Sequence, residues 1–340
     1  YLGARAERGP SILVMAPTRE LACQIQAEAD RFGRRLGIQS LCVYGGAPRG
    51  PQLRELRQGR HLVVGTPGRL NDYLEGGQLY LDYCTNLVLD EADRMLHMGF
   101  EPQMRSVVQN VRPSRQTLLF SATFPPKIER LSSDLLQQPV RITIGKLGQV
   151  AENVAQTVDV LASEQDKWPW LAERVGGMLA KGQVLVFSRS KQGVEELARS
   201  FAEELQRAAA VLHGDLDQDE RMRVLECFRQ RRADVLIATD LAARGLDVPS
   251  IRTVVSYDVA KDIETHTHRV GRTGRAGSQG EAFTLLTGDG QCRKMAAHIT
   301  QHLEQVGAPV SAELLALALK HGPFRAERLA GRGAEPKRRK

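Results

Sequence analysis

The sequence lacks the cysteine patterns that hold metal ions or disulfide frameworks. Its five cysteines are scattered, none belongs to a C-x-x-C pair, and no histidine lies at ligand spacing from two of them. We therefore expect reduced thiols, as in an intracellular protein, and no cysteine-based metal site. Extended apolar segments are missing as well: none approaches the ~20 residues that a membrane-spanning helix needs, and no signal peptide opens the chain. We expect no membrane partner.

One phosphate-binding pattern is also missing. The motif G-x-x-x-x-G-K-[ST], whose backbone amides and lysine hold nucleotide phosphates, occurs nowhere in the 340 residues. The first residue is Tyr1 rather than methionine, so we expect the sequence to be part of a longer chain. Acidic residues are not scarce: 47 basic and 40 acidic residues give a net charge of +7. This balance favours a polyanionic partner only weakly.

The chain is long enough for two domains, each with its own core. Short apolar runs alternate with helical patterns, which is typical of parallel sheets covered by helices. We predict strands at 12–16, 41–44, 61–65, 87–89, 117–120, 183–187, 209–212, 235–238, 252–257 and 281–286. Residues 145–156 carry little apolar periodicity and are predicted to be a linker. The predicted fold class is therefore α/β, with domains at 1–144 and 157–305 and a basic tail at 306–340.

The stretch from Leu87 to Asp93 ends an apolar run in three carboxylates. In parallel sheets, ligands bind at the carboxyl ends of the strands, where this stretch lies. Asp90 is placed to hold Mg²⁺ through its water shell, and Glu91 is placed to orient or deprotonate a water molecule. On its own, this pattern is more typical of a polar loop after an ordinary strand.

Polar residues and glycines follow the other predicted strands of the first half in the same way. Thr18 is placed to cap a helix, and Arg19 in its first turn is a natural phosphate contact. That helix is predicted to run to about Leu36, with Leu21, Ile25, Ala29 and Phe32 on its apolar face. The other strand ends carry Gly45 and Gly46, then Thr66, Gly68 and Arg69, then Ser121, Ala122 and Thr123. Each alone is more often a plain cap or turn, but together they are expected to converge on one edge of the sheet.

An arginine run marks the second half. His268, Arg269, Arg272 and Arg275 lie within eight residues and are separated by glycines. Cations at this density repel one another unless an anion or carboxylates hold them. Arginines that reach a developing phosphoryl charge contribute on the order of 10³–10⁵ in rate in NTPases. A salt-bridged surface loop is the plainer alternative.

Nine motifs in order resemble the DEAD-box RNA helicases of helicase superfamily two. They are PTRELA (17–22), GG (45–46), TPGRL (66–70), DEAD (90–93), SAT (121–123), FSRS (187–190), QDER (218–221), ATDLAARGLD (238–247) and HRVGRTGR (268–275). One such motif is weak, whereas nine at the family's usual spacings leave little room for chance. Two further stretches, 166–171 and 262–268, resemble a splicing-associated member of the family.

The resemblance implies two RecA-like domains in tandem with mostly parallel sheets, and ATP and Mg²⁺ as cofactors. It implies catalytic roles for Asp90, Glu91, Arg272 and Arg275, and Asp90 would also hold Mg²⁺ through water. Nucleotide contacts are implied for Gly245, Asp247 and His268. Coupling between the domains is implied for Asp93, Ser121 and Thr123. RNA contacts are implied for Thr18, Arg19, Gly46, Thr66, Gly68 and Arg69 in the first domain, and for Arg189, Gly214, Gln218, Arg221 and Thr239 in the second. Contacts to phosphates and 2′-hydroxyls carry little sequence specificity.

The departure from the family pattern matters as much as the match. The family carries the phosphate-binding loop upstream of PTRELA, and a glutamine-containing segment that reads adenine before it; neither is present. Without the lysine and its backbone cradle, Asp90 has half a metal site. We expect a first domain that is truncated at its N-terminus, with an exposed strand edge and exposed apolar surface.

The first interpretation is an ATP-dependent RNA helicase, an RNA-stimulated ATPase that remodels RNA duplexes or RNA–protein complexes in pre-mRNA splicing, but is inactive in the form given. The alternative is an ATPase-dead module that binds RNA or serves as a spliceosomal scaffold, and a DNA-directed motor is a third. The resemblance implies RNA as the partner, spliceosomal proteins as candidate partners, a monomer, and a nuclear location with the cytoplasm as the alternative. The basic run at 336–340 is more typical of a solvated tail than of a nuclear-import or RNA-binding element.

Overall fold

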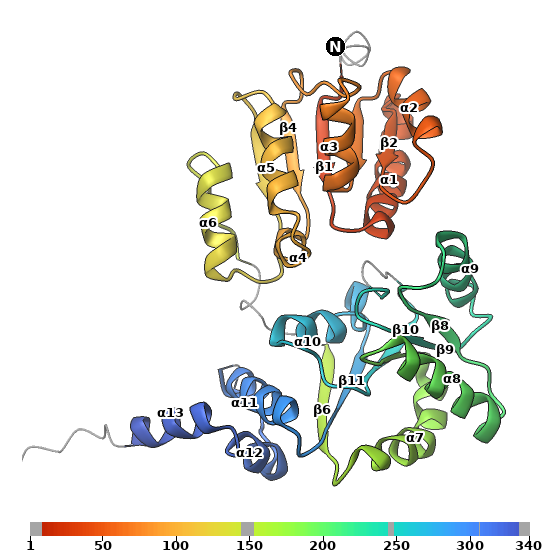
Figure 1. Ribbon diagram of the computed structural model, residues 1–340, viewed down its shortest axis with the longest axis vertical. Coiled ribbons are helices and arrows are strands. Elements are labelled where there is room, and N and C mark those ends of the chain that lie inside the picture. The colour runs from red at the N-terminus through yellow and green to blue at the C-terminus, as the bar shows by residue number, and fades with distance from the viewer. Residues whose placement is uncertain (1–8, 144–152, 244–247, 306, 333–340) are drawn as a thin grey trace, which may run out of the picture. The chain divides into compact units, whose positions relative to one another are not determined.

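The computed structural model describes residues 9–143, 153–243, 248–305 and 307–332. These residues form two compact units, an N-terminal unit that ends at residue 143 and a C-terminal unit that begins at residue 153 (Figure 1). Each unit is an α/β domain with its own parallel sheet. The predicted fold class is confirmed.

The N-terminal unit is built on a five-stranded parallel sheet with the order β2-β3-β1-β4-β5. The strands are β1 (Ile12–Met15), β2 (Ser40–Val43), β3 (Leu62–Gly65), β4 (Asn86–Leu89) and β5 (Gln116–Leu119). The helices are α1 (Arg19–Gly33), α2 (Arg49–Arg57), α3 (Pro67–Glu75), α4 (Ala92–His97), α5 (Glu101–Asn110) and α6 (Pro126–Leu135), with a 3-10 turn at Arg34–Leu36. Because every strand is parallel, all five carboxyl ends share one edge.

The two faces of this sheet are covered unequally. Alternate strand residues such as Leu13 and Met15 pack in the main core with side chains from α2, α3, α5 and α6. The intervening residues, such as Val14, pack with α1 over β1, β2 and β3. On that second face Val88 is half-buried, and its register partner Leu118 on β5 is 40% exposed.

Strand β5 is an edge of the sheet in the part of the chain that the structure describes. Beside it lies a groove of about 790 Å³ whose lining includes Leu118, Phe120 and Ile142. Phe120, one residue after β5, is 54% exposed. An all-parallel sheet normally has both faces covered, so this open, apolar edge is unusual. The exposed strand edge and exposed apolar surface expected from the sequence are therefore present.

The C-terminal unit has a six-stranded parallel sheet with the order β6-β11-β10-β7-β9-β8. The strands are β6 (Val154–Val160), β7 (Gln183–Phe187), β8 (Ala210–Leu212), β9 (Val235–Ala238), β10 (Ile251–Ser256) and β11 (Gly280–Leu286). The helices are α7 (Lys167–Lys181), α8 (Lys191–Glu204), α9 (Gln218–Arg229), α10 (Ile263–Val270), α11 (Gly290–Gln305), α12 (Ala312–Ala318) and α13 (Gly322–Arg332). The central strands β7 and β9 are buried at every position.

Three predictions need correction. Strand β6 begins at Val154, inside the predicted linker 145–156, because an edge strand that is only partly buried has a weak apolar pattern. The predicted tail 306–340 contains α12 and α13, whose Leu314, Leu317, Ala318 and Phe324 are buried together with residues of α11. Phe32, predicted on the inner face of α1, is 68% exposed, because the buried side of that helix passes through Ala22 and Gly33 instead.

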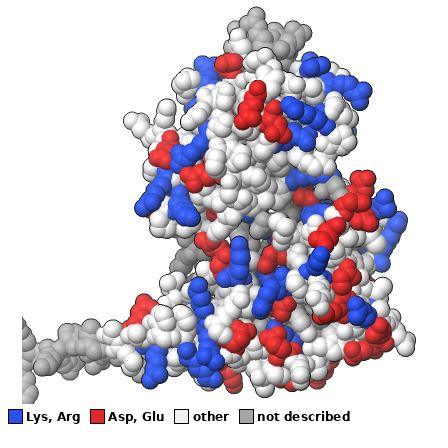
Figure 2. Space-filling view, in the orientation of Figure 1, with Lys and Arg blue, Asp and Glu red and all other residues white. Residues whose placement is uncertain are grey.

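The surface and the thiols agree with the composition. Figure 2 shows basic side chains interspersed with acidic ones over the visible faces of both units, rather than one basic face. All five cysteines are free thiols. Among the described helices, none combines the length and apolar character that crossing a membrane requires. The described residues contain no cluster of three or more His, Cys, Asp or Glu side chains that could hold a metal ion.

Candidate functional site

The three carboxylates after β4 lie at the carboxyl edge of the N-terminal sheet. Asp90 follows the last residue of β4, and one of its carboxylate oxygens accepts the backbone N–H of Glu91 at 3.0 Å. Glu91 has left-handed backbone angles (φ 49°, ψ 51°), a strained conformation for a residue with a side chain. Its Oε2 lies 3.6 Å from Nη1 of Arg94. Strained backbone of this kind is often found where a side chain must be held for chemistry.

The environment of Asp90 favours a bound cation. Burial and then the charges of Glu91 and Asp93 raise the pKa of Asp90, and the single N–H from Glu91 only partly opposes them. A carboxylate under these conditions is stabilised when a metal ion or its water shell approaches. The donor set therefore fits Mg²⁺ held through water at Asp90.

The third carboxylate connects β4 to the segment after β5. Asp93 is buried, and its Oδ2 accepts both the backbone N–H and the hydroxyl of Thr123, at 3.0 and 2.8 Å. Ser121 donates its hydroxyl to the carbonyl oxygen of Thr123 at 2.7 Å. The structure thus brings together the three residues predicted to couple the domains. The coupling itself stays a prediction.

A second group, of cations and glycine, lies on the same edge at β1 and β2. Thr18 caps α1 by accepting the backbone N–H of Leu21 at 3.3 Å, as predicted. The guanidinium of Arg19 stacks over the ring of Tyr44, 4.6 Å from its centroid. Gly46 has φ +77°, and a Cβ there would lie 4.0 Å from Nη1 of Arg19. The motifs PTRELA and GG are therefore in contact.

The segment after strand β3 contributes the second arginine of this group. Arg69, in the first turn of α3, donates from Nη2 to the carbonyl oxygen of Ala47 at 3.1 Å, which ties α3 to the loop after β2. Its Nη1 and the Nη1 of Arg19 are both buried without a hydrogen-bond partner. Thr66 precedes α3 without capping it through its side chain, and no atom lies within 4 Å of the Cβ position of Gly68. The predicted RNA-binding residues of this unit thus cluster at the ends of β1, β2 and β3, beside the carboxylates after β4.

In the C-terminal unit, the predicted RNA contacts lie at the ends of β7, β8 and β9, which are neighbours in the sheet. Arg189 follows β7 and is exposed, Gly214 follows β8 and is exposed, and Thr239 follows β9. Arg221, on α9, donates from Nη2 to the carbonyl oxygen of Ala242 at 3.2 Å. Gln218 opens α9, but its side chain lies outside the described part of the structure.

The last part of the arginine run, from Arg272 to Arg275, lies at the other end of this sheet. The hydroxyl of Thr273 donates to the carbonyl oxygens of Ile251 and Arg252, at the amino end of β10. Arg272 and Arg275 flank this anchor and donate from Nε to the carbonyls of His268 and Gly271, each at 3.1 Å. The structure therefore separates these groups from the RNA-contact candidates. Gly245 and Asp247, predicted to contact nucleotide, lie outside the described residues.

Arg269 was named in the arginine run, but its partner was not predicted. Arg269 is buried and forms a two-bond ion pair with Asp240, from Nε at 2.6 Å and from Nη2 at 2.8 Å. Its Nη1 donates to the carbonyl oxygen of Asp258 at 2.5 Å. Bidentate pairs of this kind are among the strong polar contacts of proteins. The carboxylate of Asp240, in the ATD motif at 238–240, was the signal in the sequence that could have suggested a partner for one of the arginines.

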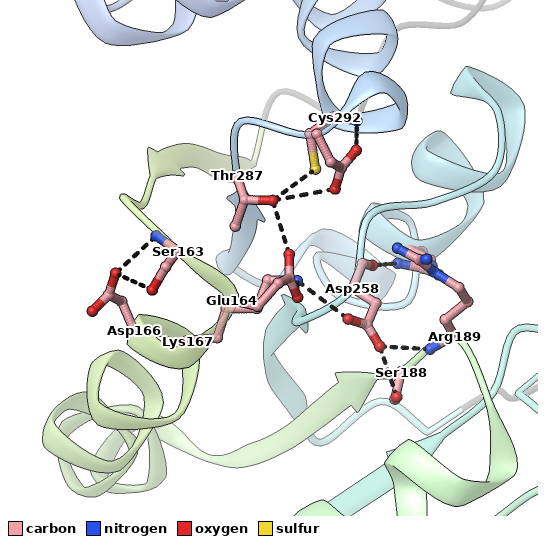
Figure 3. Close-up of polar contacts among 11 residues, drawn as sticks. Ser163, Glu164, Asp166, Lys167, Ser188, Arg189, Asp258, Thr287 and Cys292 are labelled. Carbon is pink, nitrogen blue, oxygen red and sulfur yellow. Dashed lines mark hydrogen bonds and ion pairs between the residues drawn. The ribbon is translucent and has the colours of Figure 1, made fainter.

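A second missed element is a buried polar network at the carboxyl ends of β7, β10 and β11 (Figure 3). Asp258 accepts the Ser188 hydroxyl at 2.8 Å, the Arg189 backbone N–H at 2.9 Å and the Lys167 ammonium at 3.2 Å. Lys167 is 1% exposed and also pairs with Glu164 at 2.7 Å. Thr287 donates to the other oxygen of Glu164 at 2.8 Å.

The electrostatics of this network are internally compensated. Burial alone would raise the pKa of Asp258, but the Arg189 N–H, the Lys167 charge and the Ser188 hydroxyl together lower it. The backbone of Arg189 is thereby fixed, while its side chain remains exposed. The network therefore positions the start of the FSRS segment at the end of β7.

Comparisons with known proteins agree with this arrangement. Residues 2–131 match the family model "DEAD/DEAH box helicase" and residues 167–277 match "Helicase conserved C-terminal domain". The chain is 48% identical over 326 residues to the ATP-dependent RNA helicase DDX42 of Xenopus laevis, covering 96% of this chain and 34% of that protein. It is 47% identical over 330 residues to the DEAD-box ATP-dependent RNA helicase 24 of Oryza sativa subsp. japonica, covering 97% and 42%. The chain thus spans between about a third and two fifths of these relatives' length.

Solved structures give the same result. The structure of S. cerevisiae Dbp5 bound to RNA and ADP BeF3 aligns with a TM-score of 0.76 and 28% identity over 86% of this chain and 75% of that one. A DEAD box protein from the hyperthermophile Methanococcus jannaschii is 32% identical over 87% and 78% of the two chains, with a TM-score of 0.51. With its motifs on two RecA-like parallel sheets, the chain belongs to the DEAD-box family of ATP-dependent RNA helicases.

Proposed function

We propose that this chain is the RNA-binding part of an ATP-dependent RNA helicase. The helicase remodels RNA duplexes or RNA–protein complexes. One observation carries the proposal: two guanidinium nitrogens, Nη1 of Arg19 and of Arg69, are buried without hydrogen-bond partners beside the exposed Gly46. Buried cationic donors without an acceptor are costly, and phosphate oxygens are the acceptors that fit them. An RNA backbone laid across the ends of β1, β2 and β3 supplies these oxygens.

The proposed RNA contacts read backbone rather than bases. They combine guanidinium groups, hydroxyls of Thr18 and Thr66, and glycines whose main chain can approach closely. Such groups contact phosphates and 2′-hydroxyls, so we expect RNA to be preferred over DNA, with little sequence preference. In the C-terminal unit, Arg189, Gly214 and Thr239 extend the same type of contact.

The proposed nucleotide chemistry uses the other half of the N-terminal edge. ATP with Mg²⁺ supplies the phosphoryl group to be transferred to water. Asp90 would hold Mg²⁺ through water, and Glu91 would orient or deprotonate the water that attacks the phosphoryl group. His268, Arg272 and Arg275 are proposed to stabilise charge on the phosphates, and Asp247 and Gly245 to contact the nucleotide. The 340 residues contain no G-x-x-x-x-G-K-[ST] loop to cradle the β- and γ-phosphates.

The alternative function is an ATPase-dead RNA-binding or scaffold module. We further propose a role in pre-mRNA splicing, with spliceosomal proteins as partners and action as a monomer in the nucleus. These proposals are supported by the sequence resemblance at 166–171 and 262–268. The basic run at 336–340 lies outside the described residues.

The deciding experiment is RNA-stimulated ATP hydrolysis by the 340-residue chain, beside a longer chain that includes coding sequence upstream of Tyr1. The helicase proposal predicts turnover by the longer chain, and loss of that turnover in its Glu91→Gln variant with RNA binding retained. RNA binding by both chains with turnover by neither would support the scaffold alternative. The absence of RNA binding by either chain would contradict both.

A further inference from the structure

Two cysteines that are distant in sequence meet beneath the proposed RNA-binding edge. Cys23 lies in the second turn of α1, and Cys42 lies on β2, 19 residues later. Their Sγ atoms are 4.0 Å apart and share a hydrogen bond. The two cysteines meet because α1 packs over one face of the sheet, and the side chain of Cys42 lies on that same face of β2.

The surroundings of the two thiols favour the thiolate form of one of them, Cys23. The hydrogen bond from Cys42 and then the charge of Arg19 lower the pKa of Cys23 to about 7, although burial opposes them. The same hydrogen bond, with burial, raises the pKa of Cys42. The charged or titratable groups that face Cys23 are Arg19 and Glu20 on α1 and Cys42 and Tyr44 on and after β2. Because the thiolate is the nucleophile, Cys23 is the attacking sulfur and Cys42 the resolving one.

A cavity gives small molecules access to this pair. It measures about 360 Å³, and its lining includes Cys23, Cys42, Gln26, Tyr44, Gln52 and Glu55. The side-chain amide of Gln52 makes two hydrogen bonds to the backbone of Tyr44. Its oxygen accepts the Tyr44 N–H at 3.0 Å, and its nitrogen donates to the Tyr44 carbonyl oxygen at 3.2 Å. The cavity is large enough for a peroxide and bordered by polar groups that can hydrogen-bond it.

We propose that Cys23 and Cys42 are a dithiol oxidation site, which hydrogen peroxide or an organic hydroperoxide converts into an intramolecular disulfide. The Cys23 thiolate attacks one peroxide oxygen and the O–O bond breaks. The departing hydroxide takes a proton to become water, or, with an organic hydroperoxide, the departing alkoxide takes a proton to become an alcohol. Cys42 sulfur then attacks the resulting sulfenic acid, the S–O bond breaks, and the hydroxide leaves with the Cys42 proton as water. One peroxide is reduced and two thiols are oxidised by two electrons in total.

The disulfide acts on the RNA-binding edge, and this part of the inference rests on the proposed function. Closing the sulfurs from 4.0 Å to about 2.05 Å draws the start of α1 toward β2. Arg19 is four residues before Cys23, and Tyr44, on which it stacks, is two residues after Cys42. The closure therefore displaces the Arg19 guanidinium relative to Tyr44 and Gly46. We expect oxidised protein to bind RNA about tenfold more weakly, as for one lost contact to phosphate.

The test for the disulfide uses the reduced 340-residue chain. The chain is exposed to hydrogen peroxide, quenched with catalase, unfolded in iodoacetamide and digested with trypsin without reductant. Trypsin releases Cys23 in the peptide Glu20–Arg31 and Cys42 in Leu36–Arg49, each as its only cysteine. The proposal predicts a disulfide-linked pair of these peptides, lost in Cys23→Ser. In Cys42→Ser, Cys23 should stop at a sulfenic acid that dimedone traps. Cys227→Ser, which removes a half-buried thiol of the other unit, should leave the linked pair unchanged.

Two results would overturn the oxidation site: recovery of Cys23 in its alkylated, unlinked form, or a link that appears only in dimers on a non-reducing gel. The RNA arm compares fluorescence anisotropy of reduced and oxidised chains on a single-stranded RNA. Equal affinities would contradict the effect on RNA. A linked pair in a chain that binds no RNA even when reduced would leave the disulfide standing and refute the proposed function. RNA binding without any linked pair of peptides would support the proposed function and refute the disulfide.

Discussion

Two sets of charged groups, one in each unit, differ in whether an opposite charge lies beside them. In the N-terminal unit, Asp90 lies near two further carboxylates, and the buried Nη1 of Arg19 has no hydrogen-bond partner. In the C-terminal unit, the buried Lys167 pairs with Asp258, and the buried Arg269 pairs with Asp240. The N-terminal sheet has exposed apolar side chains beside its edge strand β5, whereas α11 and α12 pack against residues of β6 and β11 in the C-terminal sheet.

This difference separates polar groups that stabilise the fold from polar groups that await a ligand. Where charges are compensated within the unit, their removal should cost stability. Where they are not, a ligand must supply the opposite charge: a cation for Asp90 and a phosphate for Arg19.

The largest effect is expected for Lys167→Met in the C-terminal unit. This variant leaves Asp258 and Glu164 without their buried cation, and breaking a buried pair from one side costs about 3–5 kcal/mol. The control Lys181→Met removes the exposed pair with Glu281 and should cost at most about 1 kcal/mol. Urea denaturation measures both. Equal losses in the two variants would show that the network does not stabilise the unit.

A smaller effect is expected for Thr123→Val in the N-terminal unit. The valine cannot donate to Asp93, which keeps only the backbone N–H from this residue, so we expect a loss of about 1.5 kcal/mol. Ser133→Ala, which removes an exposed hydroxyl bonded to the carbonyl oxygen of Glu129, should change stability by less than about 0.5 kcal/mol. Thermal unfolding followed by circular dichroism distinguishes them. A neutral Thr123→Val would mean that Asp93 is satisfied without it.

Acid should weaken the C-terminal unit. Burial and then Arg269 and His302 lower the pKa of His266 from its ordinary 6.5 to about 3. Between these values the unfolded chain binds a proton that the folded unit does not, so stability is complete above pH 6.5 and falls as the pH drops. The expected slope is about 1 kcal/mol per pH unit.

Urea denaturation at pH 7.5, 6 and 5 measures this slope. His298 and His302, whose pKa values burial also lowers, add to it, and His266→Gln should reduce it without abolishing it. Stability of this unit that is constant from pH 7.5 to 5 would contradict the assignment.

The smallest effect on stability is expected at the open edge. Leu118→Thr and Phe120→Ser alter side chains that are already largely exposed, so each should cost less than about 0.5 kcal/mol while reducing aggregation. Leu87→Thr, on the adjacent strand and fully buried, should cost several times more. Light scattering during storage reports the aggregation. A large loss of stability at Leu118 would mean that this face is covered in solution.

The sequence predicted strands well where both faces of a strand are buried. Strands β7 and β9 are continuous apolar runs, and their predicted positions agree with the structure. Strand β6 was missed because an edge strand needs only partial burial, which leaves Ala155 and Gln156 in an unremarkable polar segment. Helix α1 was placed correctly, but its inner face was not, since Phe32 points to solvent.

The candidate site was predictable where motifs are local, and not where partners come from distant segments. Asp93 and Thr123 were expected to act together because the family resemblance implied it, and they follow strands that are neighbours in the sheet. Lys167 and Asp258 are 91 residues apart, and Cys23 and Cys42 belong to different elements, so no periodic pattern connects either pair. Such contacts arise because the helix that connects two parallel strands packs over the sheet. This brings helix residues next to strand residues that are distant in the sequence.

The most direct test of the account is RNA binding by Arg19→Gln beside Arg31→Gln. Arg31 lies on the same helix but is exposed and paired with Glu28. Fluorescence anisotropy over a range of salt concentrations should show about tenfold weaker binding for Arg19→Gln, with a salt slope reduced by about one, and no change for Arg31→Gln. Equal affinities for the two variants would contradict the claim that Arg19 awaits an RNA phosphate at this edge.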